Sequence, residues 1–367
     1  MSPNPISPVT PDQADADRAD ADRADAHGAR PASFTPVGAE GITTDALLLD
    51  EQLSLTLGTR RLPAPLPGDA LVRVAWAGVC GSDLHVLRTG EWVAYWPATL
   101  GHEVVGVVQE CPGGEFGPGT VVVVDSRLPC GECEGCQTAP SLCQAMSWLG
   151  EALPGGFARH LVVPVTSLVV CPAELEPAVA VLAEPLAVAM HAIAGLGRRP
   201  DDVLLLGYGP VGALVHLELA RRWPSLPVAV SEVFEPRRQL AVAFGARVAN
   251  EQGTARYSLV IDTAGYPQSL SDAFARTANG GTVLVVALSF EAITVVPADV
   301  VERTLTIAGS IGFDSELNDA LSVLAANPDR YRPLVSEALL LEEAAERLTA
   351  LRDEPSAGKV VVRPWSE

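Results

Sequence analysis

The sequence predicts an α/β protein with two parts, a β-rich domain followed by a domain built on a parallel sheet with helices on both faces. Three observations predict it. The chain has 367 residues, which suggests about two domains, and 48% of them are apolar, which is ample for two cores. Short valine-rich runs separated by Gly and Pro fill the first half, and alternating strand and helix patterns fill the second.

The N-terminal segment, residues 1–40, is rich in Ala, Asp and Pro and contains the near-repeat ADADRADADRADA. It has no aromatic residue before Phe34, so it cannot bury enough apolar surface to offset the entropy of ordering, and we predict a disordered extension. The start has no basic segment followed by an apolar one, and no apolar run approaches the roughly 18–20 residues of a membrane span. We therefore expect a cytoplasmic protein without a membrane partner.

The net charge of −20, from 25 basic and 45 acidic residues, restricts the partners of the protein. The N-terminal segment explains little of it, because residues 11–30 hold six Asp against three Arg. An acidic body repels phosphates, which argues against nucleic acid as a partner, and it says nothing about a small neutral substrate.

The first domain is predicted over residues 41–172, from the strand-like runs DALLLD, ALVRVAWAG, VVGVVQE and TVVVVD and the turns APLPGD and CPGGEFGPG. Residues 313–367 are expected to complete it, with two helices in ELNDALSVLAAN and LEEAAERLTALRD. A last strand in KVVVRP returns to the first domain.

The second domain is predicted over residues 173–312. ELEPAVAVLAEPLAVAMHAIAGL reads as a helix with a break near Pro185, and the runs from DVLLLG to GTVLVVAL alternate between strand and helix. This alternation is typical of a parallel sheet covered by helices.

A glycine pattern follows the first strand of that domain. In DVLLLGYGPVGALVHLELARR, Gly207, Gly209 and Gly212 have the spacing G-x-G-x-x-G between a strand and a helix. The first glycine makes the tight turn, the second lets the backbone approach a pyrophosphate, and the third lets helix pack on strand. The phosphates then lie at a helix N-terminus, which attracts anions. An ordinary βαβ turn is the alternative, but the flanking strand and helix favour a Rossmann dinucleotide-binding domain.

Glu232 ends the next predicted strand, twenty residues after Gly212. Its carboxylate can accept from both ribose hydroxyls and would repel a 2′-phosphate, which favours NAD over NADP. Arg237 and Arg238 follow closely and weaken that preference, and Glu232 could instead be a surface residue. The predicted cofactor contacts are Gly207, Gly209, Pro210, Val211, Gly212, Glu232, Arg237 and Thr263.

Four of the seven cysteines fall in CGECEGCQTAPSLC, as Cys130, Cys133, Cys136 and Cys143. Four thiolates within fourteen residues can close a tetrahedral shell on one zinc ion, and such a closed site is structural. A redox dithiol pair or an iron–sulfur cluster are the alternatives, although a cluster would need a different spacing.

The stretch GVCGSDLHVLRTGEWVAYWPATLGHEVVGVV, residues 78–108, sets Cys80, His85, His102 and Glu103 between glycines and valines. A cysteine, a histidine and a carboxylate can bind zinc, and they can also be unrelated core residues.

Several motifs together decide between these interpretations, because they resemble those of zinc-dependent medium-chain dehydrogenases, the superfamily of alcohol, sorbitol and threonine dehydrogenases. The motifs are GVCGSDLH, LGHEVVGVV, the four-cysteine segment, GGFARHLVVP, AEPLAVAMHA, GYGPVG and GKVVV, and the resemblance runs from about residue 42 to the end. It implies a GroES-like catalytic domain with a Rossmann domain, two zinc ions per subunit, an NAD(P)-dependent alcohol or polyol dehydrogenase, and a homodimer or homotetramer.

The resemblance also implies roles for site residues. Residues matching Cys80 and His102 bind the catalytic zinc in that family, Glu103 is a ligand or a close neighbour, and Glu184 of E-P-L lies at the same zinc directly or through water. Such a set leaves one coordination position open for a substrate oxygen. Without the resemblance, Glu184 is a carboxylate at a helix start.

Ser82 and His85 match the proton relay of the family, in which the hydroxyl takes the proton and the imidazole passes it on through the cofactor ribose. Asp83 is expected to orient a zinc ligand. His85 could also be merely exposed. Two departures are a spacing between Cys136 and Cys143 that is one residue shorter than usual, and His160 where the family often has tyrosine; we interpret His160 as structural.

The E-P-L glutamate and the G-S-D-L-H motif favour the polyol, sugar and threonine branches, and AEPLAVAMHAI with VSEVFEPRR most resembles dehydrogenases of cyclitols and aminocyclitols. Trp92, Tyr95 and Trp96 are expected to line the substrate pocket or to be packing residues. A threonine-type amino alcohol dehydrogenase is an alternative that needs a pocket carboxylate for the ammonium. A non-catalytic binding protein on this fold would have lost a zinc ligand or a relay residue.

Overall fold

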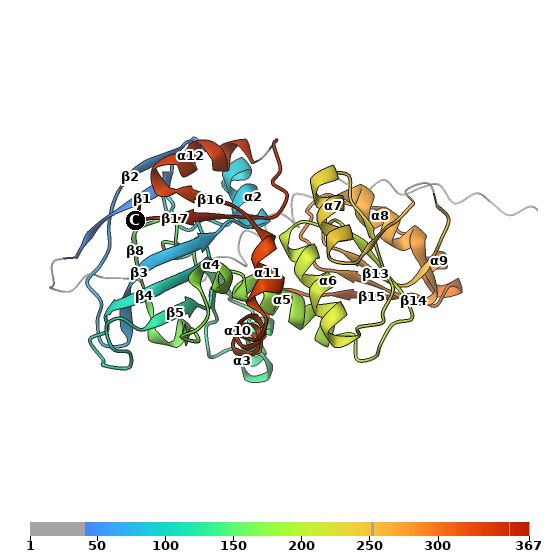
Figure 1. Ribbon diagram of the computed structural model, residues 1–367, viewed down its shortest axis with the longest axis horizontal. Coiled ribbons are helices and arrows are strands. Elements are labelled where there is room, and N and C mark those ends of the chain that lie inside the picture. Colours follow the sequence, from blue (N-terminus) through green and yellow to red (C-terminus); the bar gives the residue numbers. More distant parts are fainter. Residues whose placement is uncertain (1–40, 251–252, 352, 367) are drawn as a thin grey trace, which may run out of the picture.

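The structure is a computed structural model that describes residues 41–250, 253–351 and 353–366. Two parts lie beside one another, a β-rich part and a part around an open sheet, with helices between them (Figure 1). The predicted disorder of residues 1–40 concerns a segment outside the described residues.

The β-rich part contains a seven-stranded sheet of order β16-β17-β3-β4-β5-β9, with β8 also paired to β3. Outside this sheet lie a β-hairpin of β1 and β2, a pair of two-residue strands, β6 and β7, and the helices α2 and α3. The strands of the sheet are β3 (Asp69–Gly78), β4 (Glu103–Glu110), β5 (Val121–Val124), β8 (His160–Pro164), β9 (Leu168–Val170), β16 (Val335–Leu340) and β17 (Lys359–Arg363). The other elements are β1 (Thr43–Leu49), β2 (Leu55–Arg61), β6 (Arg127–Leu128), β7 (Ser147–Trp148), α2 (Gly81–Thr89) and α3 (Glu134–Thr138).

The C-terminal segment joins this sheet. Strand β17 pairs antiparallel with β3, with Val361 opposite Gly78 and Val362 opposite Ala77. This pairing brings Lys359, the first residue of β17, to the start of β4. Helices α10 (Glu316–Ala326), α11 (Pro328–Tyr331) and α12 (Leu341–Ala350) lie on the way from the parallel sheet to β17.

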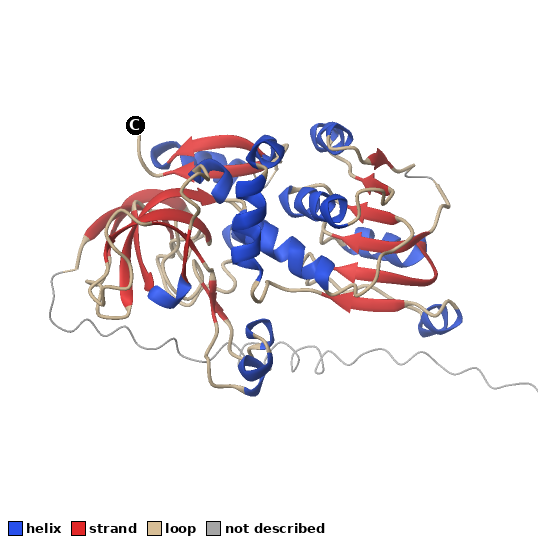
Figure 2. Ribbon diagram, turned by 60° about the horizontal axis from the view of Figure 1, so that its bottom comes forward, coloured by secondary structure: helices blue, strands red, loops and turns tan. Residues whose placement is uncertain are grey.

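The second part is a six-stranded parallel sheet of order β12-β11-β10-β13-β14-β15, with helices on both faces (Figure 2). This strand order is that of Rossmann dinucleotide-binding domains. The strands are β10 (Val203–Leu206), β11 (Val228–Ser231), β12 (Arg247–Val248), β13 (Tyr257–Asp262), β14 (Thr277–Val285) and β15 (Thr306–Gly309), and the helices are α6 (Pro210–Arg222), α7 (Glu235–Ala243), α8 (Pro267–Arg276) and α9 (Pro297–Glu302). The predicted fold class is confirmed.

Two apolar helices, α4 (Pro177–Ala180) and α5 (Ala183–Ala194), lead from the first part into the second. The helix break that we predict near Pro185 lies earlier in the chain, between α4 and α5. Pro185 itself is in the first turn of α5, where a residue needs no N–H group for an intrahelical hydrogen bond. Residues 177–194 are long and apolar enough to span a membrane, which corrects the expectation that no such run exists. Because 72% of that stretch is buried inside the protein, we interpret it as core.

Candidate active site

The start of α2 is organised by Asp83, which is 3% exposed. Its Oδ2 accepts from the backbone N–H of Cys80 at 2.9 Å, and its Oδ1 accepts from the N–H of Gly101 at 3.1 Å. The same Oδ1 lies 3.7 Å from Nδ1 of His102. Asp83 therefore holds the helix start against the loop before β4, so Cys80 and His102 face one another.

Cys80, His102 and Glu103 form a compact set, with one ligand atom of each within 4.8 Å of those of the other two. Burial opposes a charge on His102, but the negative Asp83 and Cys80 beside it raise the pKa of the imidazole well above its usual value. Nδ1 faces Asp83, which leaves Nε2 for a metal, as is common for zinc-binding histidines.

Glu103 is fully buried, and its two oxygens differ. Oε1 accepts from Nζ of Lys359 at 2.6 Å, while Oε2 has no hydrogen-bond partner in the described chain. A Cβ on Gly78 would lie 2.0 Å from Oε2, so only glycine leaves room for this carboxylate. Buried oxygens are rarely left unpaired, and a cation beside Oε2 would satisfy it. The donor set therefore fits a zinc ion.

Glu184 lies at the start of α5 and is 5% exposed. Its Oε1 accepts from Oγ of Ser126 at 2.9 Å. Burial raises its pKa to about 7, His102 opposes that effect, and the nearby Glu103 adds to it. Glu184 is close enough to interact with His102, but it is outside the compact set of three ligands.

Ser82 and His85 lie one turn apart on α2, which places them on one face of the helix. Nε2 of His85 is 2.8 Å from Oε2 of Glu91, and its ring stacks on Trp92 with centroids 4.2 Å apart. The ring of Phe290, which follows β14 of the parallel sheet, lies 5.4 Å from that of His85. His85 is thus half-buried where the two parts of the molecule meet.

The three aromatic residues of the loop after α2 differ in their contacts. Trp92 has a left-handed backbone, with φ 71°, and packs on His85. Tyr95 hydrogen-bonds through its hydroxyl with both the carbonyl and the N–H of Thr99 at 3.2 Å, so it fixes the loop itself. A Cβ on Gly90 would meet the ring of Trp96, which indicates packing.

One carboxylate near His102 was not singled out by sequence motifs. Glu151 follows β7 and is half-buried. Burial raises its pKa to about 7, while the charge of His102 lowers it and that of Asp83 raises it.

The glycine turn has the geometry that the motif predicts. Gly207 has φ 85°, and a Cβ on Gly212 would lie 2.6 Å from the carbonyl oxygen of Gly207. Gly209 has only Arg237 near the Cβ position, so the backbone there is open to a ligand.

The residues on either side of the glycine turn also hold it in place. Pro210 and Val211 begin α6. The hydroxyl of Thr263 donates to the carbonyl of Leu206 at 3.0 Å, which fixes the end of β10 where the turn begins.

Glu232 is 7% exposed and lies against the same turn. Its carboxylate accepts from the N–H groups of Tyr208 and Phe234, each at 2.8 Å. Nε of Arg237 donates to the carbonyl of Ser356 at 2.9 Å, and Arg238 donates to the carbonyl of Glu232 at 2.8 Å. The fixed carboxylate and the two arginines therefore lie together beside the glycine turn.

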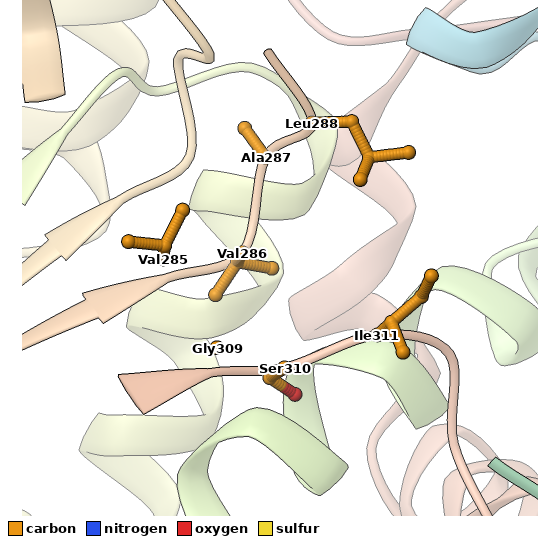
Figure 3. A pocket seen from close by; sticks show the side chains of 7 residues that line it. All are labelled: Val285, Val286, Ala287, Leu288, Gly309, Ser310 and Ile311. Carbon is orange, nitrogen blue, oxygen red and sulfur yellow. The ribbon is translucent and has the colours of Figure 1, made fainter. Parts of the chain in front are cut away.

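A cavity of about 260 Å³ opens at the carboxyl ends of β14 and β15 (Figure 3). Its lining is apolar apart from Ser310, whose hydroxyl is buried without a hydrogen-bond partner in the described chain. Ligands of α/β folds bind at the carboxyl ends of parallel strands. The residues that line it are Val285, Val286, Ala287, Leu288, Gly309, Ser310 and Ile311.

The four-cysteine segment forms an exposed lobe around α3. Four of its sulfur–sulfur distances are 3.6, 3.6, 3.8 and 4.0 Å. A zinc ion with four bonds of about 2.3 Å would require about 3.8 Å between sulfurs. Backbone N–H groups of Gln144 and Cys136 donate to the sulfur of Cys133 at 3.5 and 3.4 Å and lower the pKa of this thiol, whereas desolvation and the neighbouring sulfurs raise the pKa of Cys136.

Comparisons with known proteins agree with this geometry. The model of the alcohol dehydrogenase GroES-like domain matches residues 66–173. D-altritol 5-dehydrogenase of Agrobacterium fabrum is 31% identical over 310 residues, which cover 80% of this chain and 92% of that one. The chain belongs to the zinc-containing medium-chain alcohol dehydrogenase superfamily. It is an NAD(P)-dependent dehydrogenase of alcohols or polyols, and the four cysteines are its structural zinc site.

Two further relatives show the breadth of the family. L-threonine 3-dehydrogenase of Streptomyces avermitilis is 30% identical over 290 residues, which cover 74% of this chain and 84% of that one. The structure of a proposed zinc-binding dehydrogenase from Sinorhizobium meliloti, bound to NADP, superposes with a TM-score of 0.79 at 28% identity and covers 88% of this chain and all of that one.

Proposed function

We propose that this dehydrogenase converts a secondary hydroxyl of a polyol, sugar or cyclitol into a ketone, with NAD as the hydride acceptor and one proton released, or runs the reverse reduction. One observation carries the proposal. The compact set of Cys80, His102 and Glu103 includes a buried carboxylate oxygen without a partner, and it lies beside a helix that also carries Ser82 and His85.

A catalytic zinc would be held by Cys80 and His102, with Glu103 or Glu184 as the carboxylate ligand. Zinc bound there would supply Lewis-acid stabilisation of negative charge on the substrate oxygen. Lys359 engages one oxygen of Glu103, so the free Oε2 is the one that we assign to the metal side. With the four-cysteine site this gives two zinc ions per subunit.

The proton of the substrate hydroxyl leaves through Ser82 and His85 in this proposal. The two side chains share one face of α2, and the stacked Trp92 holds the imidazole ring in place. Oε2 of Glu91 lies 2.8 Å from Nε2 of His85, where it can accept a hydrogen bond from the ring. Glu91 is exposed, so a proton on His85 has a path to solvent. Asp83 positions the metal-binding residues and does not itself move a proton.

NAD is the proposed cofactor, since Glu232 is buried against the glycine turn with its carboxylate fixed by two N–H groups. Gly207, Gly209, Pro210, Val211 and Gly212 would take the pyrophosphate, and Arg237, beside Gly209, would neutralise part of its charge. Thr263 supports the turn. A Glu232→Ala variant should lose much of its preference for NAD over NADP, and an unchanged preference would contradict this role.

The second candidate is a threonine-type amino alcohol dehydrogenase, and Glu151 favours it as a half-buried acid near His102. A non-catalytic binding protein is disfavoured, because Cys80, Ser82, His85, His102, Glu103 and Glu184 are all present.

We further propose a cytoplasmic homodimer or homotetramer. Strand β15 is the last strand of the parallel sheet and carries the exposed Ile307, with Val301 and Ile311 exposed nearby. An open edge with apolar side chains suits pairing with a second copy. No nucleic acid or membrane is expected as a partner.

The function is tested with a panel of polyols, cyclitols, L-threonine and simple alcohols, with NAD or NADP and the zinc-loaded protein, by following the absorbance of the reduced cofactor. Polyols or cyclitols with NAD should give the highest kcat/KM. Turnover of L-threonine alone would contradict the cyclitol assignment, and turnover of simple primary alcohols alone would contradict the polyol assignment.

A further inference from the structure

The ring of His85 belongs to a three-ring cluster that joins the two parts of the molecule. Its centroid lies 4.2 Å from that of Trp92 and 5.4 Å from that of Phe290, and the centroids of Trp92 and Phe290 are 5.5 Å apart. Aromatic rings attract one another at centroid separations up to about 7 Å. Because all three separations are short, the rings form a triangle in which each one contacts the other two.

Trp92 is held against His85 by an unusual backbone conformation. Its φ is 71°, in the left-handed region that a bulky residue adopts only at a cost in free energy. Thr89 ties this loop to α2, because its Oγ1 accepts from the N–H of Glu91 at 3.2 Å and donates to the carbonyl of His85 at 3.0 Å. The strained backbone is therefore fixed locally, and it places the indole on the relay residue.

Phe290 reaches this pair from the other part of the molecule. It follows β14, and its loop begins at a fixed point, because the N–H of Val286 donates to the carbonyl of Asp262 at 3.0 Å. Leu288, between these residues, lines the cavity at the carboxyl ends of β14 and β15 (Figure 3). One short loop thus borders that cavity and also contacts the ring of His85.

Packing in a core does not account for the position of Phe290. The residue is 55% exposed, and its ring contacts are with His85 and Trp92. Contact with these two rings is therefore what the phenyl group supplies.

The orientation of the imidazole matters for its chemistry, because a proton moves only along a short and aligned hydrogen bond. Nε2 of His85 lies 2.8 Å from Oε2 of Glu91, and rotation of the ring would break this contact. Rings packed beside the imidazole oppose such a rotation. Trp92 supplies one of them from the loop after α2, and Phe290 supplies the other from the parallel-sheet part.

We propose that Phe290 is a positioning residue for proton transfer, which completes the three-ring cluster and so fixes the imidazole of His85. This inference rests on the proposed function, because it concerns the relay of the same site. Phe290 itself takes up no proton. The contact requires the two parts of the molecule to be as close as they are in this structure, so the relay is complete only in that arrangement.

Phe290→Ala tests the role in turnover, with the zinc-loaded protein, NAD and the best substrate of the polyol panel. Loss of both ring contacts should lower kcat about 3- to 10-fold, while KM for NAD stays within about threefold. Phe290→Tyr keeps the ring and should retain most of kcat. Val296→Ala, at an exposed apolar residue just before α9, is the control and should stay within about 1.5-fold.

A His85→Gln background separates positioning of the relay from a general structural role. If Phe290 acts through the imidazole, adding Phe290→Ala to His85→Gln should lower kcat by less than about 1.5-fold further. A further loss as large as that in the wild type would overturn the inference.

Fluorescence tests the cluster without turnover, in the protein before zinc or NAD is added. The emission of Trp92 is the difference between the spectra of a protein and of its Trp92→Phe variant. In the Phe290→Ala background this difference spectrum should move to longer wavelength, because water reaches the indole. An unchanged difference spectrum would overturn the inference. Phe290→Leu, which also lacks the ring, replaces the alanine variant in every experiment if that variant is unstable.

The kinetic results distinguish this inference from the proposed function. A wild type that oxidises polyols, with a Phe290→Ala variant of unchanged kcat, would overturn the inference alone. Absence of turnover on the whole panel, with zinc loaded and either cofactor, would overturn the proposed function, and the inference with it.

Discussion

The molecule has two cysteine-containing clusters, the structural zinc site and the proposed catalytic zinc site, and their surroundings differ. In the four-cysteine lobe the sulfurs lie near the surface, and four of their mutual distances are 3.6–4.0 Å. The lobe is tied to the rest of the protein by Ser141, whose N–H donates to Asp314 at 2.8 Å. The second site combines Cys80, His102 and Glu103 beneath the surface, beside a buried lysine.

The difference indicates why one site holds structure and the other can support chemistry. Four sulfurs complete a tetrahedral shell, so no position remains for a substrate. Three mixed ligands leave one position open, and in a buried site each charge acts more strongly because water is excluded. Three residues position the groups of the Cys80, His102 and Glu103 set and its neighbour Glu184. Asp83 faces His102, Lys359 pairs with Glu103, and Ser126 donates to Glu184.

The largest effect is expected from His102→Ala. Removing one of the mixed ligands should lower kcat by about 10³-fold or more, because the several kcal/mol of stabilisation by the metal are lost. The zinc content should fall by one ion per chain. His160→Ala is the control, since His160 pairs with Thr44 at 3.1 Å outside both sites, and its kcat should stay within about threefold. A His102→Ala enzyme of near wild-type kcat would remove the distinction between the sites.

Lys359→Met should destabilise the metal-free protein by about 3–5 kcal/mol, because it leaves Glu103 buried without its ion-pair partner. Urea denaturation measures this free energy of unfolding. The double variant Lys359→Met, Glu103→Gln should recover part of the loss, since no buried charge remains. A single variant that costs less than about 1 kcal/mol would show that the pair is solvated.

Metal removal should make the stability of the buried site depend on pH through Glu184. Its pKa is raised from 4.5 to about 7 in the folded protein by burial, so the folded state holds this proton more tightly than the unfolded state. Its contribution is therefore fully present below about pH 4.5 and is lost as the pH rises through 7, a loss of about 2–3 kcal/mol.

Glu184→Gln should remove this component, because the amide does not titrate and can still accept from Ser126. The measurement is the free energy of unfolding of the chelator-treated protein at pH 5 and pH 8, for the wild type and the variant. Identical pH dependences would contradict the raised pKa.

The smallest effect on turnover is expected in the lobe. Cys133→Ser should release one zinc ion per chain and lower Tm by several degrees, while kcat at 25 °C stays within about threefold. Cys111→Ser, at a half-buried cysteine outside both sites, should leave the zinc content unchanged and shift Tm less than Cys133→Ser does. A large loss of kcat in Cys133→Ser below its Tm would mean that the lobe contributes to chemistry.

Much of this comparison could be predicted from the sequence, because it depends on local spacing. The four cysteines fall within fourteen residues, and the glycine turn lies between a strand and a helix that have clear periodicities. The fold class also follows from such local signals. Cys80 and His102 are farther apart in the chain, and their motifs identify them only through resemblance to a family.

Other features depend on contacts between distant segments, which no local pattern records. Lys359 meets Glu103 only because β17 returns to β3, and Ser126 meets Glu184 across the interface of two elements. Glu151 has no motif, since its position is set by the backbone contacts of the loop that carries it. The break before α5 was misplaced because a proline in a first turn of a helix is compatible with helix formation.

The most direct test is the zinc content of the wild-type enzyme measured together with turnover, while zinc is withdrawn stepwise with a chelator. We predict two zinc ions per chain at full activity, and a loss of activity in proportion to loss of the ion at Cys80 and His102 even while the four thiolates keep theirs. Full turnover with a single zinc ion per chain, bound by the four cysteines, would contradict this account.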